Sequence, residues 1–177
     1  MRHHPVQDVR VALQAPVLDA TSSSFTLSKG GIAMAQFESP HLRLQQQIDC
    51  QLEVMPKDVL KEWEKQNWKE EPGTDVDEAP IKYMALILLD AIEERATRLS
   101  VDKDQGVTVY GETTYTLPKA PSHYIARGLE ILREITGLEV PGGEGRLSLG
   151  VRDSNLELIV QKQGGQHMIN IPGIGML

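Results

Sequence analysis

The second half of the sequence restricts the fold most, because helical and strand patterns alternate there in a regular order. Apolar residues recur at helical spacing from Ile81 to Ala96 and from Ile125 to Ile135. Each helical segment is followed by short runs in which apolar and polar residues alternate, as in strands that are buried on one face. We therefore expect residues 76–177 to form an α+β domain, an antiparallel sheet flanked by helices in the order helix, hairpin, helix, meander.

Turn sequences and helix caps mark the boundaries of these elements. Gly106 ends a turn between strands predicted at residues 99–101 and 107–110, and residues 113–117 extend the second strand or pair with it. Ser122 is predicted to cap the second helix at its start, and Gly137 to end it. The closing meander is predicted at residues 147–151, 156–160 and 168–171.

The first 75 residues follow a different pattern. Residues 1–33 sustain neither a helical nor a strand period, and we expect a disordered leader before a true start at Met34. Residues 34–75 are expected to hold a strand, a short helix and a linker. Apolar residues alternate from Leu42 to Val54, which predicts a half-buried strand, and Pro56 should open the helix.

Composition excludes several classes of function. The net charge of -7 over 177 residues argues against nucleic acid as a partner and against an anionic membrane surface, since both attract clustered Lys and Arg. The single cysteine, Cys50, allows no intramolecular disulfide and no cysteine-rich zinc site. Together with the lack of an apolar signal segment, this predicts a cytoplasmic protein.

No stretch of the sequence carries a coherent catalytic motif. Residues 106–113 have the glycine spacing of a phosphate-binding loop, but Glu112 stands where the loop needs lysine, so a plain hairpin is favoured. The histidines are scattered, and His41, His123 and His167 have no second ligand at metal-binding spacing. We therefore expect no enzymatic activity, no catalytic residue, no metal and no cofactor.

From about Ala79 to Ile171 the sequence resembles the second N-terminal domain of the ATPases that drive type II secretion and type IV pilus assembly, a PAS-like domain. One matching segment is Ala96-Thr97-Arg98-Leu99-Ser100, where the family commonly has Ala-Ser-Asp-Ile-His before its first strand. Another is Gly143-Glu144-Gly145-Arg146, where the family has Gln-Asp-Gly-Arg. The resemblance implies the fold expected above.

The resemblance also implies that contacts to nucleotide have been lost. Ile159 and Asn170 stand where the family has arginines that help to hold nucleotide, and no ATPase motor follows in the sequence. An apolar side chain cannot replace a charge-assisted contact to phosphate. The implied function is that of a non-catalytic regulatory or adaptor module, with Arg98 and Arg146 as candidate ligand-binding residues.

The partner that the resemblance implies is another protein, an assembly ATPase or a further component of the same machinery. An alternative function is a PAS-like sensor, in which the sheet and the two long helices enclose a nucleotide, a cyclic dinucleotide or another small ligand. A second copy of the chain is an alternative partner. It would pair through the predicted strand at 42–54 if that strand lies at the edge of the sheet.

Overall fold

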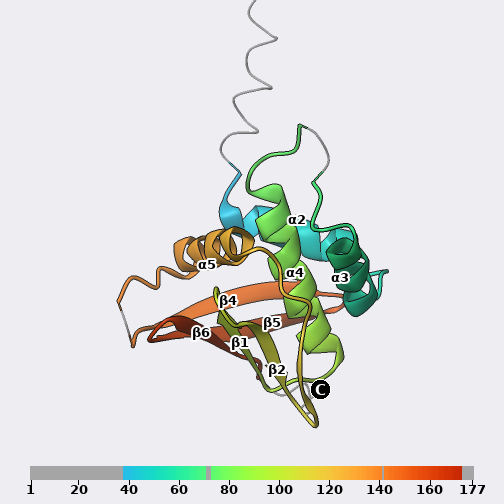
Figure 1. Ribbon diagram of the computed structural model, residues 1–177. Coiled ribbons are helices and arrows are strands. Elements are labelled where there is room, and N and C mark those ends of the chain that lie inside the picture. Colours follow the sequence, from blue (N-terminus) through green and yellow to red (C-terminus); the bar gives the residue numbers. More distant parts are fainter. Residues whose placement is uncertain (1–37, 71–72, 141, 173–177) are drawn as a thin grey trace, which may run out of the picture. The chain divides into compact units, whose positions relative to one another are not determined.

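The computed structural model describes residues 38–70, 73–140 and 142–172, so the predictions for residues 1–33 lie outside the described part of the chain. A compact unit begins at Glu38. Its helices and strands, shown in Figure 1, follow the order predicted from residue 76 onward. They are α2 (Pro40–Gln51), α3 (Pro56–Lys65), α4 (Glu78–Glu93), β1 (Arg98–Asp102), β2 (Gly106–Tyr110), β3 (Thr114–Thr116), α5 (Ser122–Thr136), β4 (Glu144–Val151), β5 (Ser154–Gln163) and β6 (Gln166–Asn170).

The strands form one antiparallel sheet in the order β3-β2-β1-β6-β5-β4. The predicted α+β class and the order helix, hairpin, helix, meander are confirmed, and residues 114–116 pair with β2 as a third strand. The helices lie on one face of the sheet (Figure 1). Along β4, side chains alternate between buried and accessible positions, as expected for a sheet covered on one side.

The centre of the core is α4 rather than the sheet. All residues from 79 to 92 except Lys82 are buried, because α2, α3 and α5 each pack against this helix. The sequence pattern predicted an amphipathic helix forming one wall of the core. Its extra apolar residues, such as Leu86 and Leu89, are fully buried as well, because α2 and α3 from the N-terminal segment pack against the helix in addition to α5.

The strand predicted at 42–54 is wrong: most of this segment is the helix α2. Leu44 and Ile48 are four residues apart and both fully buried, so the helical spacing decides the structure. Leu42, which the alternating pattern would have buried, is 48% exposed. The Ser39 side chain accepts a hydrogen bond from the backbone N–H of Leu42, which stabilises the first turn.

One edge of the sheet is covered by α2. The Gln45 side chain donates to the backbone oxygen of Gly150 (2.8 Å) and accepts from its N–H (2.9 Å). His41 Nε2 lies 2.6 Å from the backbone oxygen of Ser148. The predicted pairing of two copies through a strand at 42–54 is therefore wrong, because this segment is a helix that binds the free side of β4.

Close approach of helices shapes the other side of α4. Gly128 of α5 lies against Met84, where an added Cβ would come within 2.6 Å of the Met84 Cγ. Gly137 ends α5 with φ of 67°, as predicted. Ser122 is the first helical residue rather than the cap, a position that Pro121 takes, so this prediction is wrong by one residue.

Candidate functional site

The two arginines singled out from the sequence lie on the face of the sheet that none of the described helices covers. Arg98 is paired with Asn170 across β1 and β6, Asn170 with Ile159 across β6 and β5, and Ile159 with Arg146 across β5 and β4. Tyr110 of β2 extends this row beyond Arg98. We call these five residues the outer row.

The geometry of the outer row keeps its two arginines apart. Three strand spacings separate Arg98 from Arg146, or about 14 Å between their Cα atoms. The Arg98 guanidinium lies over the Tyr110 ring, 4.6 Å from its centroid, and Arg146 forms a 3.0 Å ion pair with exposed Glu157. Each cation thus contacts a different neighbour, and the two do not converge on one anion-sized position.

The middle of the outer row is neutral. Asn170 and Ile159 are both half-buried, and neighbouring polar side chains bond one another: Gln161 donates to Glu144, and Ser100 donates to Gln166. A surface of this mixed character can contact another protein, whereas it offers no clustered cations to a phosphate group.

A buried polar cluster joins α3, α4 and β3. Asp90 of α4 is only 2% exposed and accepts a 2.7 Å hydrogen bond from the Tyr115 hydroxyl. The Lys57 ammonium lies 4.0 Å from Asp90, 2.7 Å from Glu94 and 4.1 Å from the centre of the Tyr115 ring. Burial raises the pKa of the Asp90 carboxyl, and the Tyr115 hydrogen bond and Lys57 oppose that shift.

Sequence reasoning missed this cluster, although one signal was available. Asp90 is a charged residue directly after the apolar run Met84–Leu89, at a position that a buried helix fills with apolar side chains. Its partners Lys57 and Tyr115 are 33 and 25 residues away in sequence, so no local pattern names them. None of the three lines a cavity described below, and the cluster holds the elements together rather than meeting a substrate.

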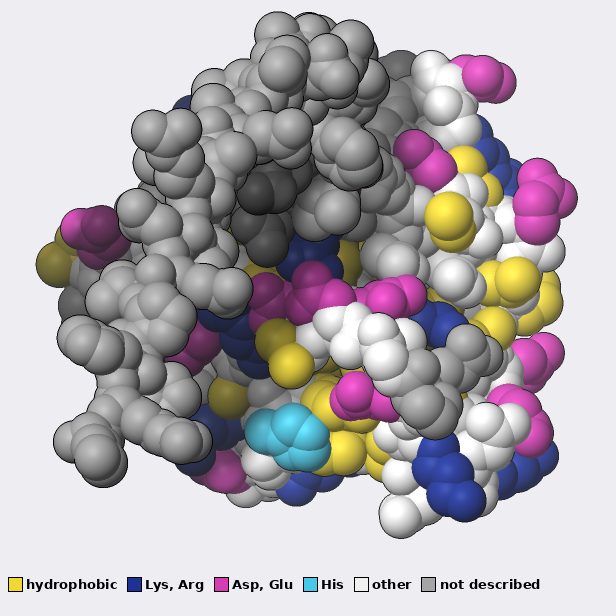
Figure 2. All heavy atoms as spheres, turned by 90° about the horizontal axis from the view of Figure 1, so that it is seen from above, with side chains coloured by type: hydrophobic (Ala, Val, Ile, Leu, Met, Phe, Trp, Pro, Cys, Tyr) yellow, Lys and Arg dark blue, Asp and Glu magenta, His cyan; other side chains and the backbone are white. Residues whose placement is uncertain are grey.

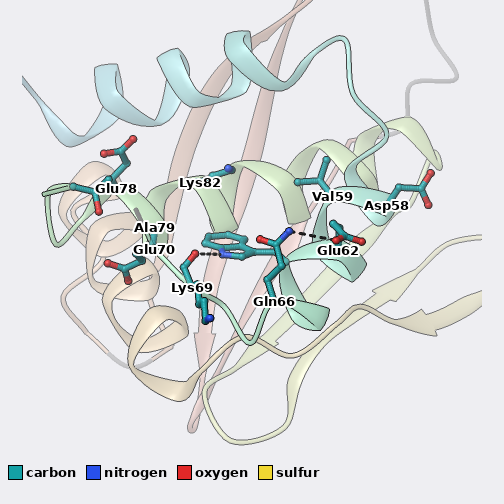
Figure 3. A pocket seen from close by; sticks show the side chains of 11 residues that line it. Asp58, Val59, Glu62, Gln66, Lys69, Glu70, Glu78, Ala79 and Lys82 are labelled. Carbon is teal, nitrogen blue, oxygen red and sulfur yellow. Dashed lines mark hydrogen bonds between the residues drawn. The ribbon is translucent and has the colours of Figure 1, made fainter. Parts of the chain in front are cut away.

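A groove of about 630 Å³ lies between α3 and the start of α4 (Figure 3). Its α3 wall carries the Glu62 carboxylate, and its α4 wall carries the Glu78 carboxylate and the Lys82 ammonium. The Trp63 ring in the groove is 9% exposed and donates from Nε1 to the Lys69 oxygen. It packs against Trp68, with 5.3 Å between the ring centroids.

His167 is the buried histidine of the described chain. It lies on the core face of β6 at 8% exposure, and its Nδ1 has no hydrogen-bond partner among the described residues. Burial lowers the pKa of the imidazole, and the charges of Lys162 and Arg133 lower it further. The imidazole is not part of a metal site, because the described residues form no group of three or more His, Cys, Asp or Glu side chains that could hold a metal ion.

On the helix side of the molecule, the coloured part of Figure 2 shows Asp and Glu side chains interspersed with Lys and Arg. One such mixture joins three helices, where Asp77 at the start of α4 binds Arg127 of α5 at 2.6 Å and Arg43 of α2 at 3.6 Å. Hydrogen bonding to Arg127 lowers the pKa of the Asp77 carboxyl. These ion pairs stabilise contacts between helices.

Among the described helices, none is long and apolar enough to cross a membrane. Comparisons with known proteins give no family: no protein-family model matches the sequence, and a search of curated proteins finds no significant match.

Proposed function

We propose that this protein is a non-catalytic regulatory or adaptor module, related to the second N-terminal domain of secretion and pilus ATPases, that acts in the cytoplasm through contacts with another protein. The partner we propose is an assembly ATPase or another component of the same machinery. The single observation that carries the proposal is the outer row. The positions matching the family's arginines, Ile159 and Asn170, are central and neutral on a sheet face that is free of helices from the described part of the chain.

The packing of the core supports the same proposal over a ligand sensor. A PAS-like sensor would hold its ligand between the sheet and the helices. Leu99 and Ile169 on the inner face of the sheet and Leu88 of α4 are each 0% exposed, so apolar side chains fill this layer. In the family, arginines supply positive charge to the phosphates of the nucleotide. The arginines of the outer row, Arg98 and Arg146, are about 14 Å apart and therefore do not meet at one phosphate.

Site-specific photo-crosslinking in cells tests the proposal. A photoreactive residue at Ile159, in the middle of the outer row, should capture a defined partner that mass spectrometry identifies as a component of a secretion or pilus machinery. A photoreactive residue at Asp58, on the exposed side of α3, serves as the control position. Recovery of no partner from Ile159, or ATP hydrolysis by the purified protein, would contradict the proposal.

A thermal-shift screen with nucleotides and cyclic dinucleotides tests the sensor alternative. A ligand at a hundredfold excess over its dissociation constant stabilises a protein by about 2.7 kcal/mol, which shifts the melting temperature measurably. The adaptor proposal predicts no shift with any of them. A reproducible shift with one nucleotide would favour the sensor.

A further inference from the structure

A small notch separates the C-terminal end of α4 from the β4–β5 turn. Its volume is about 270 Å³, just below the roughly 300 to 1,000 Å³ of most small-molecule sites. The apolar side chains of Ile92, Val151 and Leu156 line it, and two arginines, Arg95 and Arg152, line it as well. A cavity of this size and lining suits one apolar side chain with a charged neighbour better than a cofactor.

Both arginines hold a backbone conformation that favours glycine. Arg95 has φ of 54° and Arg152 has φ of 53°. Arg95 follows the last turn of α4, where its N–H bonds the Ile92 oxygen and the Ala96 N–H bonds the Ala91 oxygen, an arrangement that usually has glycine at this position. Arg152 begins a two-residue turn between paired strands, another position where glycine is preferred.

Local structure explains only in part why arginine, and not glycine, stands at positions 95 and 152. A cation near the C-terminus of a helix is favoured by the helix dipole, which explains charge at Arg95 but not at Arg152 on a hairpin. Arg152 forms a 3.6 Å ion pair with Glu93 while its side chain stays 70% exposed. The Arg95 side chain has no hydrogen-bond or ion-pair partner among the described residues. Glu93 lines the notch too, so two arginines and one carboxylate (2 − 1) leave the lining a net charge of +1, in a chain whose net charge is -7.

We propose that this notch is a docking site for a segment of a partner protein that presents an apolar side chain next to a carboxylate. The apolar side chain would enter between Ile92, Val151 and Leu156, and the carboxylate would meet Arg95 and Arg152. Charge complementarity selects this occupant, because arginines outnumber carboxylates in the lining of this notch on an otherwise acidic protein. The inference rests on the proposed function and adds the chemistry of the partner.

Binding of short peptides to the full chain tests the proposal by NMR. The probe is a capped hexapeptide with the sequence Gly-Ser-Leu-Glu-Ser-Gly, compared with one peptide in which glutamine replaces the glutamate and one in which alanine replaces the leucine. The first peptide should move the amide signals of Ile92, Val151 and Leu156. Each replacement should weaken binding by about tenfold, the effect of losing one charge-assisted contact or one buried side chain.

Variants separate a binding role from a structural one. Arg95→Gly and Arg152→Gly should each melt at or above the wild-type temperature, since glycine suits a positive φ, yet bind the peptide about tenfold more weakly. Arg95→Lys keeps the charge and should bind more tightly than Arg95→Gly. Arg133→Ala is the matched control, because Arg133 is an exposed arginine that lies outside both the notch and the outer row, and this variant should bind the peptide as wild type does.

Three results would overturn the proposal. The first is no signal change at millimolar peptide, and the second is equal binding of the glutamate and glutamine peptides. The third is a different occupant of the notch. A second copy of the chain would move the same signals when protein concentration alone is raised, and the chain's own C-terminal residues would do so if deleting residues 173–177 moved them. A partner captured at Ile159 while the peptide fails to bind would overturn only the docking site. The proposed function fails separately, if nothing is captured at Ile159.

Discussion

At the scale of single residues, Asp90 shows how one buried charge is accommodated. Replacement by asparagine keeps an oxygen that accepts from Tyr115 and removes the burial cost of the charge, so Asp90→Asn should be at least as stable as wild type. Asp90→Ala leaves the Tyr115 hydroxyl without this acceptor and should cost about 1–3 kcal/mol. Urea unfolding of the three proteins measures both effects.

Comparing the stability of wild type and Asp90→Asn at several pH values checks the direction in which the pKa of Asp90 is changed. Because the pKa of Asp90 is raised above its ordinary value of 3.8, the folded state binds this proton more tightly than the unfolded state does. The contribution of Asp90 to stability therefore decreases as the pH rises through the raised pKa. The stability of Asp90→Asn relative to wild type should therefore increase as the pH rises above the ordinary pKa of 3.8, and a difference that does not change with pH would contradict the raised pKa.

His167 should make the fold sensitive to acid. Its pKa lies below the ordinary value of 6.5, so the unfolded state takes up the proton first as the pH falls. Stability is complete above about pH 6.5 and decreases below it. His167→Leu should remove this dependence below about pH 6.5, whereas the exposed-site variant His123→Gln should keep it. Parallel acid dependence in His167→Leu and wild type would show that other groups cause it.

The chemistry of these residues was only partly visible in the sequence. Alternation along β1 and β4 is enough to predict that Arg98 and Arg146 point away from the core. Their common row follows from pairings of β1 with β6 and of β5 with β4, over separations that no local pattern reports. The same holds for the contact of Asp90 with Tyr115 and Lys57.

At the scale of elements, α2 protects the β4 edge, and Gln45 is the residue to test. Gln45→Ala removes both hydrogen bonds to Gly150 and should cost about 1–3 kcal/mol, by the usual net contribution of such bonds. It also frees backbone groups that can pair with another chain. Sedimentation should show concentration-dependent association of this variant.

The control for Gln45 lies on the same helix. Gln46 is exposed and makes no hydrogen bond to β4, so Gln46→Ala should stay as stable and as unassociated as wild type. Equal association of both variants would show that the Gln45 bonds do not protect the edge.

The contrast between α2 and β4 shows why element prediction succeeded in one half of the chain and failed in the other. In β4, the alternation of Leu147, Leu149 and Val151 fits only a strand. In α2, Leu42 and Leu44 fit a strand while Leu44 and Ile48 fit a helix, so the local sequence permits both. Packing of Leu44 and Ile48 against α4 decides for the helix.

At the scale of the whole molecule, the described chain should unfold as one unit. Helices α2, α3 and α5 all pack on α4, and α2 also binds β4, so no element of this core is independent. Trp63 and Trp68 fluorescence reports the α3 region, while circular dichroism reports the helices and the sheet. Urea transitions by the two probes should coincide, and an earlier fluorescence transition would show that α3 unfolds separately.

The sequence by itself determined the local elements of residues 76–172, because the period of apolar residues, the glycines at turns and the helix ends act over a few neighbours. Only the tertiary structure decided the burial of α4 on every side, the helical state of residues 40–51 and the alignment of the outer row. These depend on contacts between residues far apart in sequence, whose free energy no short segment contains.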